Sequence, residues 1–121
     1  MMEAMEVREV RESEAVVRFT PETATVSFSG ALRLANVKAY ESVAKLLAEA
    51  AGQVSGPLTL DFKELKFLNS SGITALSLFV VSSRKAGKPQ LRLVGAKQNA
   101  WQQKSLANFQ MLWKDMQLVI E

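Results

Sequence analysis

The amino-acid sequence predicts a single α/β domain in which helices pack on a mixed sheet of about four or five strands. Segments with strand-like and helix-like hydrophobic spacing follow one another in the order strand, strand, helix, strand, helix, strand, helix. A helical crossover between the second and third strands favours parallel pairing of those two strands. The length of 121 residues, 48% of them hydrophobic, suits one domain with one core.

The N-terminal part predicts a tail followed by a hairpin. Residues 1–12 are charged and weakly patterned, so we expect a tail in front of a domain spanning residues 13–121. Residues 14–20 form the first expected strand, and Pro21 with Glu22 form a turn. Residues 23–29 alternate apolar side chains with Ser and Thr, which predicts a half-buried strand paired with the first.

The first helix and the third strand follow from a cap and an apolar run. Asn36 can cap a helix whose apolar residues recur at helical spacing as far as Gly52. Residues 58–62 are mostly apolar, which predicts a strand buried on both faces. The polar residues 63–66 are then expected to form a connector.

The second helix is predicted over residues 71–86. Asn69 or Ser70 can accept hydrogen bonds from its first turn, and Gly87 is a typical stop signal. Residues 90–94 form a fourth strand, residues 95–109 a third helix, residues 112–116 a further helical turn, and residues 117–120 a short strand or a tail. The expected core residues are Val26, Phe28, Val43, Leu47, Leu58, Leu60, Ile73, Leu76, Phe79 and Val94.

The composition argues against an enzyme. The chain has no cysteine and no histidine, which removes thiolate chemistry, disulfides, the commonest general base and the commonest metal ligand. No phosphate-binding or dinucleotide-binding glycine motif is present, and we expect neither a metal nor a cofactor. Asp61 and Glu64 could together bind a cation, but a solvated connector is the simpler interpretation.

Charge and hydropathy favour a cytoplasmic protein that does not bind nucleic acid. Residues 1–61 carry six basic and nine acidic side chains, and residues 62–121 carry nine basic and three acidic ones. The basic residues are scattered without interleaved aromatic residues, so a solvated surface is favoured over a nucleic-acid site. No run of eighteen apolar residues and no apolar signal core occurs, so we expect no membrane span and no secretion signal.

The run from Phe67, F-L-N-S-S-G-I-T-A-L, resembles the D-S-S-G-x-x-x-L signature of STAS domains, the bacterial anti-sigma-factor antagonists and their relatives. The resemblance covers nearly the whole chain, from about Ala15 onward. Gly30 and Leu32 also match the G-E-L-D run of that family, whereas Arg33 and Asn69 replace its two acidic residues.

The resemblance implies that Ser70 is phosphorylated and that the protein acts in signal transduction and transcription regulation. The implied partners are an anti-sigma factor with serine kinase activity and a cognate phosphatase. Ser71 and Gly72 complete the motif, and Asp61, Asn69 and Arg33 are expected to flank it. The two replaced acids should make the site more electropositive, which could favour a bound phosphate or prevent recognition by the usual kinase.

Helix-end chemistry suits phosphate, although serines at this position often serve only as caps. Free backbone N–H groups and the helix dipole stabilise a phosphate at a helix N-terminus. We therefore expect an exposed Ser70 and a less accessible Ser71. Two alternatives stay open: a STAS subunit of a lipid-transport ABC system that docks on its ATPase without phosphorylation, and a small enzyme or nucleotide-binding protein that uses the same helix end.

Overall fold

The described residues form one six-stranded sheet with three helices on one side of it. The structure is a computed structural model that describes residues 7–12 and 14–121. The strands lie side by side in chain order: β1 Arg8–Glu12, β2 Glu14–Thr20, β3 Thr25–Leu32, β4 Leu58–Leu68, β5 Leu91–Gly95 and β6 Gln117–Ile120. The β1–β2 and β2–β3 pairs are antiparallel, and the remaining pairs are parallel. The mixed α/β sheet is thus confirmed, with more strands than the four or five expected.

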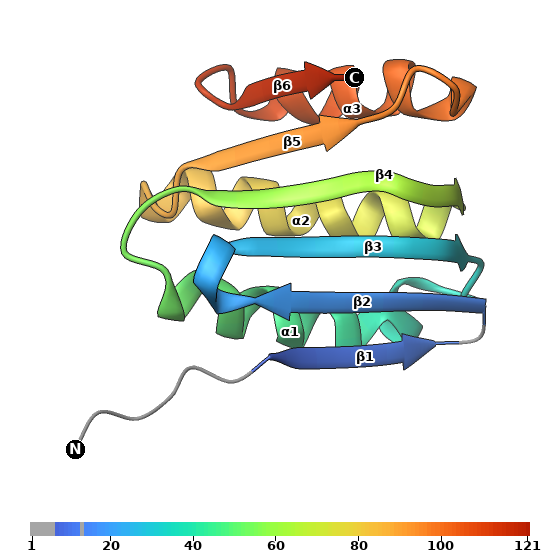
Figure 1. The fold of residues 1–121 in the computed structure, drawn as a ribbon, viewed down its shortest axis with the longest axis horizontal. Coiled ribbons are helices and arrows are strands. Elements are labelled where there is room, and N and C mark those ends of the chain that lie inside the picture. Colours follow the sequence, from blue (N-terminus) through green and yellow to red (C-terminus); the bar gives the residue numbers. More distant parts are fainter. Residues whose placement is uncertain (1–6, 13) are drawn as a thin grey trace.

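The helices cover one face of the sheet and leave the other open. The helices α1 Glu41–Gln53, α2 Ser70–Ala86 and α3 Ala100–Leu112 lie behind the sheet in Figure 1. Short 3₁₀ turns, η1 Pro21–Thr23 and η2 Val37–Tyr40, precede β3 and α1. The helix–sheet interface holds one hydrophobic core, in which the Phe28 and Phe62 rings stack with centroids 4.6 Å apart.

Strand β4 differs from the prediction in two ways. Its first residues alternate between buried and half-buried, so the strand is covered on one face and not on both. It also continues to Leu68 through the expected connector, residues 63–66. Two register shifts against β3 explain the pattern, because each adds one residue to β4. These bulges bring Phe62, Leu65 and Leu68 to the core side although they are three residues apart.

The expected N-terminal tail is wrong for residues 8–12, which form the edge strand β1. This strand pairs with β2, and the Glu9 carboxylate accepts hydrogen bonds from Arg18 opposite it. Arg8 reaches Glu49 on α1. Because β1 carries charged side chains on both faces, it lacks the alternation of apolar and polar residues by which a strand is predicted. The same charges discourage pairing of this edge strand with other chains. Residues 1–6 of the expected tail lie outside the described residues.

Most of the predicted core is confirmed. Eight of the ten expected residues are buried, whereas Ile73 and Phe79 are half-buried and pack against the core. The third helix begins five residues later than expected, because residues 96–99 form a turn. The helical turn expected at residues 112–116 is wrong, and Gln117–Ile120 is a strand. Among the described residues, no helix is both long enough and apolar enough to cross a membrane.

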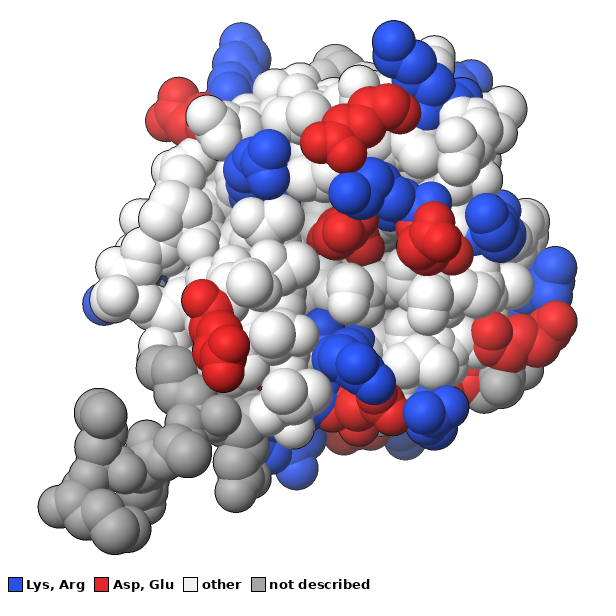
Figure 2. Space-filling view, in the orientation of Figure 1, with Lys and Arg blue, Asp and Glu red and all other residues white. Residues whose placement is uncertain are grey.

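The open face of the sheet is polar and mixed in charge. It carries side chains such as Ser27, Thr59 and Asp61 from successive strands. Figure 2 shows basic and acidic side chains interspersed over the described part of this face. Lys63 pairs there with Glu121, and this contact raises the pKa of the Lys63 ammonium above its usual value. The positive charge of the C-terminal half is therefore dispersed rather than gathered on this face.

Candidate functional site

The motif serines lie where α2 begins, directly after β4. Asn69 is the N-cap of this helix, and its Oδ1 accepts a hydrogen bond of 3.0 Å from the Gly72 N–H. The sequence left either Asn69 or Ser70 as the cap. The structure has Asn69 in that position, and Ser70 is the first helical residue. Gly87 ends the helix in a left-handed conformation, as its position predicts.

Asn69 also holds the loop after β3 against this turn. Its Oδ1 accepts a second hydrogen bond of 2.6 Å from the Tyr40 hydroxyl, and its Nδ2 donates one of 2.8 Å to the Leu34 carbonyl. Its backbone N–H donates to the Leu32 carbonyl at 3.1 Å. The side chain therefore uses both the acceptor and the donor of an amide, which a carboxylate could not do.

Tyr40 packs against the buried side of the first turn of α2. Its side chain is 2% exposed and lies against Gly72, where a Cβ atom would come within 2.7 Å of the tyrosine hydroxyl. Burial raises the pKa of the Tyr40 hydroxyl, and the Leu34 N–H donor opposes part of that shift. A glycine is needed in this first turn because the ring occupies the space of a side chain.

The two serines differ in exposure as predicted. Ser70 is exposed, whereas Ser71 is half-buried. The first N–H groups of a helix have no partner within it. In the described structure, Asn69 accepts hydrogen bonds from the Gly72 N–H at its side-chain oxygen and from the Ile73 N–H at its backbone carbonyl. The N–H groups of Ser70 and Ser71 remain for solvent or for an anion.

Arg33 flanks the site without making it strongly electropositive. Its guanidinium donates to the Glu14 carboxylate and lies over the Phe67 ring, 4.9 Å from the centroid. The acidic partner offsets the positive charge that replaces an acid in the STAS pattern. Phe67, 40% exposed, adds an apolar surface three residues before Ser70.

Asp61 does not belong to the site, contrary to expectation. It lies on β4 opposite Ser27 of β3 and Val94 of β5, and its carboxylate accepts from the Lys63 N–H at 3.0 Å. The seven residues to the end of β4 place it roughly 20 Å away at the usual rise of a strand. The described residues contain no group of three side chains that could hold a metal ion, at Asp61 and Glu64 or elsewhere.

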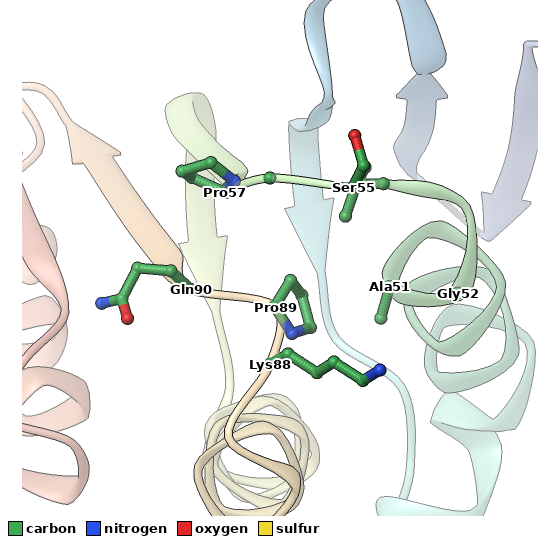
Figure 3. Close-up of a pocket in the computed structure, with 9 residues that line it drawn as sticks. Ala51, Gly52, Ser55, Pro57, Lys88, Pro89 and Gln90 are labelled. Carbon is green, nitrogen blue, oxygen red and sulfur yellow. The ribbon is translucent and has the colours of Figure 1, made fainter.

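One pocket lies at the opposite end of the sheet, between the loop after α1 and the turn before β5 (Figure 3). Its volume is about 350 Å³, and the lining residues include Gly52, Pro57 and Pro89. Lys88 is the one charged side chain among them. Ser55 also lines the pocket, but its hydroxyl and the Lys88 amine point away from each other (Figure 3).

The sheet, the three helices on one face and the two serines at the start of α2 define a STAS-like fold. No family model and no curated protein sequence matches the chain.

Three solved structures share this fold. One is the crystal structure of diguanylate cyclase SiaD in complex with its activator SiaC from Pseudomonas aeruginosa. The matched chain is 16% identical, with 94% of this chain and 99% of that chain covered and a TM-score of 0.69. SiaC of the same organism matches with 18% identity, 96% coverage of both chains and a TM-score of 0.62. Apo-SiaC matches with 15% identity, coverages of 97% and 99%, and a TM-score of 0.63. At these identities the similarity establishes the fold.

Proposed function

We propose that this protein is a non-enzymatic regulator that binds a partner protein in the bacterial cytoplasm and is switched by phosphorylation of Ser70. The observation that carries this proposal is the exposed Ser70 hydroxyl at the first position of α2, beside a half-buried Ser71. A kinase could reach the first serine far more easily than the second.

The helix end suits a phosphorylated serine. A phosphate on Ser70 would add a charge of about −1.5 to −2 next to the N–H groups of Ser70 and Ser71 and the positive end of the helix dipole. Asn69, and not Ser70, caps the helix. Phosphorylation would therefore change the surface charge without removing the bonds that hold the turn, and a partner docked there would meet a dianion in place of a hydroxyl.

Two kinds of partner fit this role. The STAS resemblance implies an anti-sigma factor with serine kinase activity and a phosphatase that reverses the modification. The structurally similar SiaC is the activator of a diguanylate cyclase and was solved in complex with it. A signalling enzyme of that kind is thus the second candidate, and in both cases the unphosphorylated protein is the binding form.

Phosphosite mapping of the protein purified from its own host tests the switch. We expect phosphate on Ser70 in the wild type and in Ser71→Ala, and its loss in Ser70→Ala. The partner should co-purify with Ser70→Ala and less well with Ser70→Asp, although one carboxylate carries less charge than a phosphate. Phosphate on other residues only would reject the switch and favour docking without phosphorylation, as in a lipid-transport ABC system.

A further inference from the structure

A shallow apolar groove runs between α1 and α2 on the side of the helices that faces away from the sheet. Its volume is about 450 Å³, and small side chains from both helices form its floor, including Ala44, Ala48 and Ala75. Leu78 and Val37 line it with 59% and 38% of their surfaces exposed. Two of the five exposed large hydrophobic side chains among the described residues therefore line one groove.

The groove adjoins the switch. Ser70, Thr74 and Leu78 are successive residues at four-residue spacing on α2, and all three are exposed. Residues with this spacing follow one another along one side of a helix. At the same end, η2 contributes Val37 and Lys38 to the groove, and its Tyr40 bonds to Asn69. A molecule in the groove would thus extend toward the serine turn.

We propose that this groove binds an amphipathic helix of the regulated partner; the proposal rests on the proposed function. The backbones of α1 and α2 satisfy their own hydrogen bonds, so an extended strand would find no backbone partners there, whereas a helix brings its own. The lining residues on each helix extend over eight positions, 41–48 on α1 and 75–82 on α2, or about 10 Å, which matches about two turns of a docked helix.

The charged residues at the groove indicate which charges the docked helix should carry. Lys38 and Glu41 line the end near η2, and neither has an ion-pair partner within the described structure. The docked helix would present apolar residues at i, i+4 and i+7, with an acid placed for Lys38 and a base for Glu41. One lysine beside one glutamate is a poor match for an anionic membrane, which attracts clusters of basic residues.

A second copy of this chain is also a poor occupant. The exposed row on α2 offers Leu78 as its large apolar side chain, between the polar Thr74 and Ser82. One such side chain could not fill a groove that accommodates about two turns.

Site-specific photo-cross-linking in the host gives the first test. A benzophenone amino acid replaces Leu78 in the full chain, and Met111 on α3, which is 75% exposed, provides the matched control position. We expect position 78 to cross-link one protein through a segment with helically spaced apolar residues, and position 111 not to do so. Adducts with this chain itself, with lipid only, or with no molecule at position 78 would overturn the proposal.

A titration with a synthetic peptide of the cross-linked segment gives the second test. Leu78→Asp and Ala48→Glu should each weaken its binding by about tenfold or more, as loss of an interface hot spot does. Met111→Asp should change it by less than about twofold, since substitutions away from the contact are near neutral. Thermal unfolding of each variant checks that it is folded.

The two proposals fail separately. Equal peptide binding by wild type and Leu78→Asp would reject the groove. If a partner's binding still responded to Ser70 phosphorylation in that variant, the proposed function would stand with another docking surface.

Discussion

Asn69 is the residue on which the site depends most. Its side chain joins the start of α2 to the Tyr40 hydroxyl and the Leu34 carbonyl, which both lie in the connection between β3 and α1. An aspartate, as in the STAS pattern, would keep the acceptor and lose the donor to Leu34. The replacement of that acid by an amide therefore has a local reason in hydrogen bonding.

Removing the Asn69 amide should destabilise the fold more than removing an ordinary cap. We expect Asn69→Ala to lower the free energy of unfolding by about 2–4 kcal/mol, because a cap is lost and the buried Tyr40 hydroxyl loses its acceptor. Asn36→Ala, which removes only the exposed cap of η2, should cost about 1 kcal/mol or less. Urea denaturation measures both, and equal costs would show that the contacts to Tyr40 and Leu34 add little.

The buried Tyr40 hydroxyl should make the folded protein less stable at high pH. Its folded-state pKa is raised by burial, so above about pH 10, the usual tyrosine value, the unfolded chain releases the proton first. The stability that the protonated Tyr40 hydroxyl contributes is fully present below that pH, and it is lost as the pH rises through the raised pKa.

The single tyrosine of the chain allows a direct measurement of this effect. Ultraviolet absorption should show the phenolate appearing at higher pH in the folded protein than in urea. Tyr40→Phe should flatten the alkaline fall in stability, and the part that remains should include Lys63, whose pKa is also raised by its acidic neighbours. A phenolate titration identical in both states would contradict the buried position of the ring.

At the scale of elements, α3 completes the hydrogen bonding of β4 where β5 no longer does. The β4–β5 pairing covers Leu58 to Asp61, whereas β4 runs on to Leu68. Beyond that point the carbonyl groups of the bulged segment accept from side chains at the start of α3. Asn99 donates to Lys63, Trp101 to Leu65, and Gln102 to both Phe62 and Leu65.

Gln102 should be the most sensitive polar position of α3. Its side chain is fully buried and also accepts from the Ala96 N–H at 2.7 Å. We expect Gln102→Ala to cost about 2–4 kcal/mol, because the Ala96 N–H and the Phe62 carbonyl would lose this partner, whereas the Leu65 carbonyl keeps Trp101. The neighbouring, exposed Gln103→Ala should change stability by less than about 0.5 kcal/mol. Chemical denaturation of the two variants provides the comparison, and a small cost at position 102 would mean that water replaces the amide.

At the scale of the whole molecule, stability should fall from the centre of the sheet to its edges. Strands β3 and β4 are paired on both sides and covered by helices, whereas β1 and β6 are short and paired on one side. Opening an edge strand exposes little apolar surface, so it can occur without global unfolding.

Amide hydrogen exchange should follow this order. We expect the slowest exchange in β3 and β4 and clearly faster exchange in β1 and β6, measured by mass spectrometry of peptides or by NMR. Residues 8–12 should nevertheless be protected relative to an unstructured peptide, since they pair with β2. Full-rate exchange in that segment would favour the tail expected from the sequence over the edge strand.

The sequence by itself determined the features that depend on local chemistry. The hairpin, the stop at Gly87 and the contrast between Ser70 and Ser71 were all predictable, because hydrophobic period and glycine act over a few residues. Asn36 is a cap as expected, but of the 3₁₀ turn η2 and not of α1 itself. The core residues followed for the same reason, except that Ile73 and Phe79 face the margin of the packed side of α2.

The tertiary structure alone decided the features that join distant residues. The continuation of β4 depends on bulges against β3, and the positive charge of Arg33 is offset by Glu14, nineteen positions earlier. The remote position of Asp61, the contacts of Gln102 forty residues from Phe62, and the groove between α1 and α2 arise in the same way. The sequence shows which side chains are present. Only the folded chain shows which of them lie together, and therefore which charges are offset and which side chains are buried or exposed.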